Sequence, residues 1–287
     1  MESEIFEHAW TRQRISSQTL TQLRQRIDRA RRAALGLAIA TAVLAVAAGQ
    51  VKASLPDTAR VLGFIAAITA GWGGLIARQT ELDKVEIWAR ARSFSEGIKS
   101  EVYQCLAGAS AYAGVDADAQ LFKRVCEIEA EAYPAEQETL GLVSDGKPIP
   151  EVHDVESYIA ARVTDQIECF YRPKATLYKQ RVGMLTRASG GLAALAVVLS
   201  ALSSAYGWGG AAAWVPVVTT ITTALAAYIS ASRYEEQIVD YLSTARQLEK
   251  LRLSRLTKER SDAPFIDACE ALMAAENKAW QAGWSDR

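Results

Sequence analysis

The chain has 287 residues, of which 23% are charged and 50% are hydrophobic, and its formal net charge is −1. This composition argues against a disordered polymer and against a nucleic-acid-binding protein. The charges are unevenly distributed, because residues 33–51, 61–77 and 188–232 contain no Asp, Glu, Lys or Arg. Three long uncharged runs are hard to enclose in so charged a remainder, which argues against a simple soluble globule.

The three uncharged runs are long enough to cross a membrane. A transmembrane helix needs about 20 mostly apolar residues, with a usable range of about 17–25. Residues 33–51 and 61–77 each provide one such helix, and residues 188–232 provide two joined by a short turn at 206–210. The alternative is a pair of buried core helices, but interfacial aromatic residues near the proposed ends favour the membrane: Trp72, Tyr206, Trp208 and Trp214. We therefore predict four spans in two hairpins.

Basic residues near the spans predict the orientation. Arginines are dense just before residue 33, and further bases follow residue 77 and precede residue 188, whereas the connector 206–214 has none. Positively charged flanks stay on the cytosolic side, so both termini and the middle segment should face the cytosol. Three arginines at span ends are predicted to fix topology or to take part in gating: Arg78, Arg187 and Arg233. Residues 1–32 are too long and too polar for a signal peptide, so we expect no cleavage there.

The remaining segments are predicted to be helical. The expected order is an N-terminal basic amphipathic helix (1–32), a first transmembrane hairpin (33–77), a helical cytosolic segment (78–187) with a linker near 134–153, a second transmembrane hairpin (188–232) and C-terminal cytosolic helices (233–287). Apolar residues recur at steps of three and four in the charged segments, which predicts a cytosolic stalk or bundle of long helices. A break or kink is expected at Pro173. The fold class is therefore an all-α membrane protein.

The two halves have the same order of elements, a basic helix, a hairpin and a charged helix. This predicts an internal repeat whose two hairpins enter the membrane in the same sense. The alternative is that any two hairpins look alike.

Small and hydroxyl residues are concentrated in the spans. Gly63, Ala67, Gly71 and Gly74 offer a small-residue surface on which helices can approach closely. The candidate pore-lining residues are Ser200, Ser203, Thr219 and Thr223. Their hydroxyls could line a water-filled path, bond across helices, or bond their own backbone. No ionisable residue lies in a span, which argues against a proton-coupled transporter.

The sequence offers few residues for catalysis. His8 and His153 are the only histidines and have no motif around them, and the four cysteines lack metal or redox spacing, as expected of reduced thiols. An acidic run fits a solvated helix face better than a divalent-ion site: Glu127, Glu129, Glu131, Glu136 and Glu138. We expect no enzyme, no cofactor and no metal site.

Two motifs in the charged segments resemble the SLATT family, the SMODS- and SLOG-associating two-transmembrane effector domains. The first lies after the first hairpin and comprises Trp88, Arg92, Glu96, Ile98, Lys99, Ser100 and Tyr103. The second lies before the second hairpin and comprises Asp165, Gln166, Tyr171, Lys174 and Ala175. Two hairpins bracketing a helical segment look like the tandem form of the family.

The resemblance implies a bacterial conflict-system effector that acts at the inner membrane when a nucleotide signal, made or sensed by partner proteins, is present. Its implied action is pore formation or membrane disruption. No ligand-sensing domain is recognisable in this chain, so the trigger is expected from a partner or from a pocket among the helices.

The leading hypothesis is a homo-oligomer in the inner membrane that forms or gates an ion-conducting path. The alternative is a non-conducting membrane anchor or scaffold for a partner. The expected partners are the lipid bilayer, further copies of the chain and a nucleotide-signalling protein, and no nucleic acid.

Overall fold

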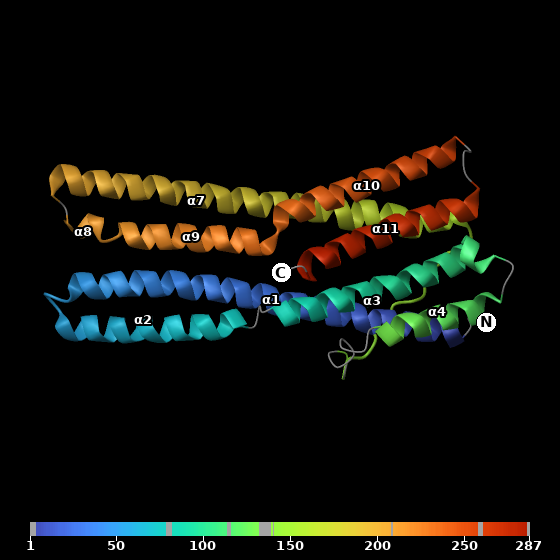
Figure 1. Cartoon of the computed structure of the whole chain (residues 1–287), viewed down its shortest axis with the longest axis horizontal. Helices are drawn as coiled ribbons and strands as arrows, with labels where there is room; N and C mark the ends of the chain where they lie inside the picture. Colours follow the sequence, from blue (N-terminus) through green and yellow to red (C-terminus); the bar gives the residue numbers. More distant parts are fainter. Residues whose placement is uncertain are drawn as a thin grey trace. The chain divides into compact units, whose positions relative to one another are not determined.

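The computed structural model describes residues 4–78, 82–113, 116–131, 139, 141–207, 209–257 and 261–285 (Figure 1). Three residues named above, Trp208, Glu136 and Glu138, lie outside the described ranges. Every regular element in the described ranges is helical. In chain order these are α1 (Glu4–Val51), α2 (Pro56–Ala77), α3 (Leu82–Ala107), η2 (Ser110–Tyr112), α4 (Ala117–Glu131), α6 (Val155–Tyr158), the π-helical turns η4 (Ile159–Thr164) and η5 (Gln166–Tyr171), α7 (Arg172–Tyr206), α8 (Gly209–Ala212), α9 (Val215–Ser232), α10 (Tyr234–Leu256) and α11 (Asp262–Ser285).

Four helical stretches are long and apolar enough to cross a membrane, as predicted. They are Glu4–Val51, Pro56–Ala77, Val155–Tyr206 and Gly209–Leu256. In each case the most apolar part is at least four-fifths unburied within the chain, as expected of helices that face lipid or another chain. The predicted fold class, an all-α membrane protein, is confirmed.

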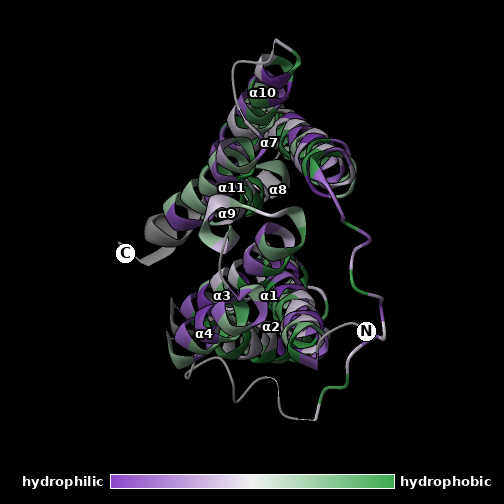
Figure 2. Cartoon of the chain, turned by 90° about the vertical axis from the view of Figure 1, so that its right-hand side faces the viewer, coloured by the Kyte–Doolittle hydropathy of each residue, from purple (hydrophilic) through white to green (hydrophobic). Residues whose placement is uncertain are grey.

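The chain forms two compact units. We call the first the charged unit; it comprises Met1–Gln25, Leu82–Thr176 and Ile238–Arg287. The second, the span unit, comprises Arg26–Glu81 and Leu177–Gln237 and contains the three uncharged runs. Coloured by hydropathy, α3 and α4 of the charged unit mix hydrophilic and hydrophobic residues along one helix, as amphipathic helices do (Figure 2).

In the span unit, α1 and α2 form a close hairpin. Pro56 at the start of α2 suits this position because its fixed φ is that of a helix. The backbone N–H that proline lacks would have no hydrogen-bond partner within the first turn. The contact follows Ala59 and Ala66, which are buried, and Gly73, where an added Cβ would lie 3.6 Å from Leu37 Cβ. Between Ala66 and Gly73, the hydroxyl of Thr69 lies 2.8 Å from the hydroxyl of Thr41 on α1. Small side chains at seven-residue intervals therefore set the close approach.

The four small residues predicted to pack lie on another face of α2. Gly63, Ala67, Gly71 and Gly74 are all exposed. A Cβ added at any of the three glycines would meet nothing within 4 Å. Within the described chain these residues therefore do not form the hairpin contact, and their packing role stays a prediction for contact with a second copy.

The span hydroxyls mostly bond their own helix. Ser200 donates to the carbonyl of Ala196 at 2.9 Å, and Thr219 donates to the carbonyl of Val215 at 2.7 Å. Ser200, Thr219 and Thr223 are exposed, and Ser203 is half-buried. A hydroxyl that donates to a carbonyl of its own helix can face lipid without an unsatisfied polar group. Of the three predicted arrangements, the structure therefore contains bonding to the residue's own backbone.

The arginines at the span ends turn away from the spans or end a helix. Arg187 Nε donates to the carbonyl of Gly183, one turn earlier, at 2.9 Å. Arg78 follows the last residue of α2 with helical dihedral angles. Arg233 ends α9 in the left-handed conformation, at φ 49°, and pairs with Glu236. These contacts suit cations at the polar boundary of a membrane, where long side chains reach for the headgroup region.

In the charged unit, an extended segment crosses α1 before the helices resume. Trp10 Nε1 donates to the carbonyl of Lys147 at 2.9 Å, and Arg14 pairs with Asp145. Asp154 then caps α6 by a reciprocal pair of hydrogen bonds with Ser157. Pro173, where a break or kink was predicted, is the second residue of α7 directly after the π-helical turns. The irregularity is therefore a change of helix type ahead of the proline.

Candidate functional site

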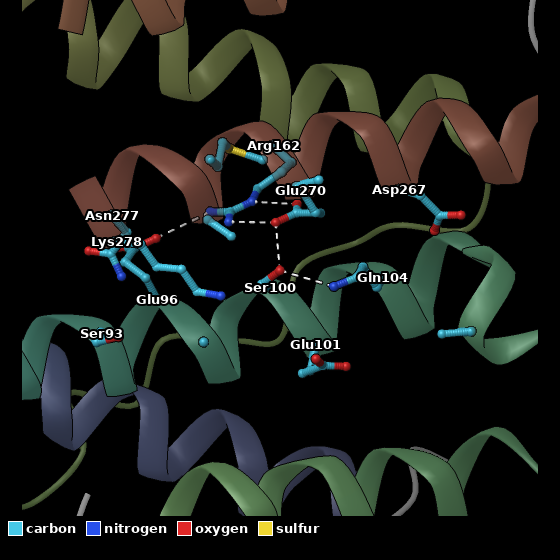
Figure 3. A pocket seen from close by; sticks show the side chains of 15 residues that line it. Ser93, Glu96, Ser100, Glu101, Gln104, Arg162, Asp267, Glu270, Asn277 and Lys278 are labelled. Carbon is cyan, nitrogen blue, oxygen red and sulfur yellow. Dashed lines mark hydrogen bonds and ion pairs between the residues drawn. The ribbon is translucent and has the colours of Figure 1, made fainter. Parts of the chain in front are cut away.

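A buried carboxylate, Glu270 on α11, is the centre of a polar cluster between helices (Figure 3). Arg162 donates to both of its oxygens, from Nε at 2.9 Å and from Nη2 at 3.0 Å. Tyr158 donates from its hydroxyl at 2.9 Å, and Ser100 donates at 2.8 Å. These four bonds satisfy a carboxylate that is only 3% exposed and join α3, α6 and η4 to α11.

Arg162 is 2% exposed and makes its other contacts with residues of α3 and η5. Its guanidinium lies 5.1 Å from the centre of the Tyr103 ring. Its Nη1 lies 3.7 Å from Glu96 Oε2. With the Gln166 amide oxygen turned toward them, Arg162 Nη1 donates to it at 3.2 Å and Lys99 Nζ at 2.9 Å. We call this set, together with Glu270, Tyr158 and Ser100, the buried network.

A second ion pair extends the same interface. Arg92 on α3 donates from Nη2 to the two carboxylate oxygens of Glu276 on α11, at 3.1 and 3.2 Å. Arg92 is 8% exposed, and the Glu276 side chain is 5% exposed. Apolar side chains of α11 fill the space between the polar contacts: Phe265, Ile266, Cys269 and Met273. The α3–α11 contact is therefore an apolar interface with one buried ion pair, Arg92–Glu276, and the buried pair Arg162–Glu270 joins η4 to α11.

Most residues of the first motif lie at this interface. Arg92, Glu96 and Lys99 take part in the contacts above, and Tyr103 also donates to the carbonyl of Ala161 at 3.4 Å. Trp88, 7% exposed, has the guanidinium of Arg24 over its ring at 5.7 Å. Spacings of three and four place these residues on one face of α3, which explains why the motif recurs at helical intervals.

The residues of the second motif differ in burial and in the side chains that they contact. Tyr171 is buried in a cluster of aromatic rings, 5.3 Å from Phe170 and 5.7 Å from Tyr241 between centroids. Asp165 is exposed and Lys174 is half-buried. Of this motif, Gln166 joins the buried network directly.

Burial and neighbouring charges shift several pKa values in opposite directions. Burial alone would lower the pKa of Arg162, but Glu270 raises it above its ordinary value, so the guanidinium stays charged. Burial lowers the pKa of Lys99, and the nearby Arg162 lowers it further against the opposing effect of Glu96. Burial raises the pKa of Tyr158, and Glu270 raises it further. The phenol therefore stays protonated and continues to donate to Glu270.

A cavity of about 450 Å³ opens beside the network. Its lining includes four acidic residues, Glu96, Glu101, Asp267 and Glu270, against the two bases Arg162 and Lys278. Tyr112 donates to Glu101 at 2.6 Å, and Asp267 accepts from the Ser110 backbone at 3.2 Å. Neither His8 nor His153 lines the cavity, and the described residues include no group of His, Cys, Asp and Glu that could hold a metal ion.

We predict that Glu96 makes stability depend on pH. Burial would raise its pKa, but Lys99, Arg162 and Arg92 lower it below the ordinary value of about 4.3. A folded pKa below the unfolded one gives stability that is complete above about pH 4.3 and is lost as the pH falls through the folded pKa. Glu96→Gln should therefore lower the Tm at pH 7, modestly because 40% of the side chain is exposed to screening solvent.

The measurement is thermal unfolding of both proteins between pH 7 and pH 3. The Tm difference between them should shrink below about pH 4. A difference that stays constant over the whole range would contradict the lowered pKa of Glu96.

Four spans in two hairpins, with a helical unit held by buried ion pairs, define a polytopic all-α membrane protein. Residues 158–280 match the family model of the SMODS and SLOG-associating 2TM effector domain 1, and residues 14–120 match a model described as a protein of unknown function, DUF4231. Residues 158–280, in the second half of the chain, thus form a SLATT domain. No curated protein and no solved structure matched it.

The two matched regions each contain one hairpin, and the buried network joins them. Ser100 and Glu96 lie in the first region, and Arg162 and Glu270 lie in the second. Arg162 and Glu270 were not among the predicted site residues. Each is the single charge of a short run, 157–164 and 268–275, and this was the signal in the sequence that could have identified them.

Proposed function

We propose that the protein is an oligomeric effector of the bacterial inner membrane that forms or gates an ion-conducting path. The supporting observation is that polar span residues lie on the outside of the span unit. Thr219, Thr223 and Ser200 are all exposed in the single chain. In an assembly, such faces can surround water, because rings of oxygen atoms can line an ion path.

Oligomerisation is part of the proposal. Four narrow, Ala-rich spans leave too little room for a water-filled path within one copy. The exposed glycines Gly63, Gly71 and Gly74 offer a surface on which a neighbouring helix could approach closely. The membrane placement of the spans and the SLATT effector domain support an action at the bilayer.

The charged unit is the proposed receiver of the trigger. The buried network connects both halves of the chain, so a partner that separates α3 from α11 would act on both at once. We propose that a nucleotide-producing or nucleotide-sensing partner supplies this trigger in an antiviral or other conflict system. The basic flanks of the spans support an orientation with both termini in the cytosol.

The rival function is a non-conducting anchor for a partner protein. The observation that favours it is that Ser200 and Thr219 are already satisfied by carbonyls of their own helices. Such hydroxyls need no water and could face lipid.

Substitution of the exposed threonines distinguishes the two functions. Val has the shape of Thr without the hydroxyl, so Thr219→Val with Thr223→Val should change ion flux from liposomes by about twofold or more if these residues line a path. Thr222→Val is the matched control, because Thr222 is half-buried in the same helix and bonds the carbonyl of Val218 at 2.9 Å. Equal flux in all three proteins would show that Thr219 and Thr223 do not line the path, and no flux from the unmodified protein would favour the anchor.

A further inference from the structure

The span unit contains a second cavity, of about 300 Å³, among α1, α7, α9 and α10. Its polar lining comprises Arg32, Arg181, Asp28, Tyr228 and Tyr234, and its apolar lining comprises Leu35, Met184 and Leu185. None of these residues belongs to the buried network of the charged unit. The cavity is amphipathic, with cationic and phenolic groups beside aliphatic side chains.

The cavity lies at the polar end of the spans. Arg32 is the last charged residue before the uncharged run 33–51, and Arg181 lies shortly before the run 188–232, near whose end Tyr228 lies. Leu35 lies inside the first run, three residues beyond Arg32. The lining therefore passes from charged to apolar at the depth where a bilayer passes from headgroups to hydrocarbon.

The two arginines have further N–H groups that could donate to a ligand. Arg32 uses Nε to bond the Asp28 carbonyl at 3.1 Å, and Arg181 uses Nη1 to bond the Tyr234 hydroxyl at 3.4 Å. Each guanidinium has five N–H donors, so both have others in reserve. Tyr234 is 6% exposed and is held against Tyr178, with ring centroids 4.9 Å apart. A fixed phenol therefore positions Arg181.

Charge and shape together indicate the class of ligand. Two arginines against the single carboxylate of Asp28 leave the lining with an excess of one positive charge. Met184 is 61% exposed, so an apolar side chain remains open beside these cations. A free phosphate would use only the cationic half of such a cavity, whereas a lipid with an anionic headgroup would use both halves.

We propose that this cavity binds an anionic phospholipid, whose phosphate bonds Arg32 and Arg181 and whose acyl chain lies along Leu35 and Met184. Basic pockets between transmembrane helices at the cytosolic side suit such headgroups. The bound lipid would contact helices of both hairpins at once. This site is independent of whether the protein conducts ions.

The test is native mass spectrometry of the purified full chain in detergent, titrated with phosphatidylglycerol or with phosphatidylcholine. Each arginine near an anionic headgroup contributes about 1 kcal/mol, so Arg32→Gln with Arg181→Gln should weaken phosphatidylglycerol binding by about tenfold or more. The matched control is Lys52→Gln with Arg60→Gln, which removes two cations from the connector at the opposite ends of the spans and should leave binding unchanged.

Two further measurements show whether the cavity recognises an anionic lipid or phosphate alone. Phosphatidylcholine should bind more weakly than phosphatidylglycerol, and inorganic phosphate at the same concentration should not displace the lipid. Equal binding of the two lipids, displacement by inorganic phosphate, or unchanged binding by the double Gln variant would each overturn the proposal.

A second measurement does not depend on the folding of variants. A photoactivatable phosphatidylglycerol analogue with its reactive group on the acyl chain should crosslink the unmodified protein at peptides containing Leu35 or Met184. Crosslinks confined to other parts of the spans would overturn the proposal.

Discussion

Replacing Glu270 by Ala should lower the free energy of unfolding of the charged unit by about 3–5 kcal/mol, because it leaves the guanidinium of Arg162 buried without its partner. Arg162 is 2% exposed and Glu270 is 3% exposed, so water cannot easily replace the lost carboxylate. Tyr158 and Ser100 would lose an acceptor at the same time. In a unit of this size the loss corresponds to a fall in Tm of roughly 10 °C, measured by circular dichroism of the purified protein.

Two further variants show whether the pairing itself is responsible. Arg162→Met combined with Glu270→Met removes both charges, so the double variant should regain much of the Tm that Glu270→Ala loses. Glu86→Ala is the matched control, since it breaks an exposed pair with Arg90 one turn away and should cost less than about 1 kcal/mol. A Glu270→Ala variant that melts within 2 °C of the unmodified protein, by roughly the error of such scans, would contradict the buried network.

Reversing the three arginines at the span ends to Glu should strongly reduce correct insertion. The variant Arg78→Glu with Arg187→Glu and Arg233→Glu removes cations from the side that the positive-inside rule assigns to the cytosol. Cys126 and Cys169 are exposed in the charged unit, so they report its location without added labels. A membrane-impermeant maleimide applied to spheroplasts should leave the unmodified protein unlabelled and should label the variant several-fold more.

Arg60→Glu is the control for this experiment. Arg60 is exposed in the opposite connector, where it pairs with Asp57, so its reversal should leave the cysteines protected. If the triple variant is also protected but its ion flux is altered, the three arginines act in gating and do not set topology. Labelling of the unmodified protein from outside would contradict the proposed orientation itself.

The spans were predictable because their signal is local. An uncharged run such as 33–51 or 61–77 is recognised by its length and composition alone. Each of the four helical stretches contains one of these runs or part of the run 188–232. The continuation of α1 from a basic segment into a span was equally predictable from the sequence, since no Gly or Pro interrupts residues 4–35. The helix type ahead of Pro173 was less predictable, because π-helical turns depend on surrounding contacts.

The face that each residue occupies was harder to predict. In α2, the pairs Ala59–Ala66 and Gly63–Ala67 are equally small, yet only the first pair is buried. Composition cannot distinguish them, because the choice depends on how α1 lies against α2. A seven-residue interval, Ala59 to Ala66 to Gly73, was the better indicator of this contact.

The buried network is the part that sequence reasoning missed. The motif residues Arg92 and Ser100 were identified by their resemblance to the SLATT family. Their partners, Glu276 and Glu270, come from α11, far along the chain. Local patterns hold no information on such long-range pairs. The contacts of this motif form only in the folded protein, where α3, η4 and α11 pack together.

The central proposal is that the assembled protein conducts ions, and planar bilayer recording tests it most directly. The protein is purified, shown by light scattering to be oligomeric, and reconstituted as the unmodified chain and as Glu270→Gln, which weakens the proposed receiver of the trigger. We expect discrete current steps, more frequent with Glu270→Gln than with the unmodified chain. Silent bilayers with both folded, oligomeric proteins across the whole voltage range would contradict conduction and leave the membrane anchor as the function.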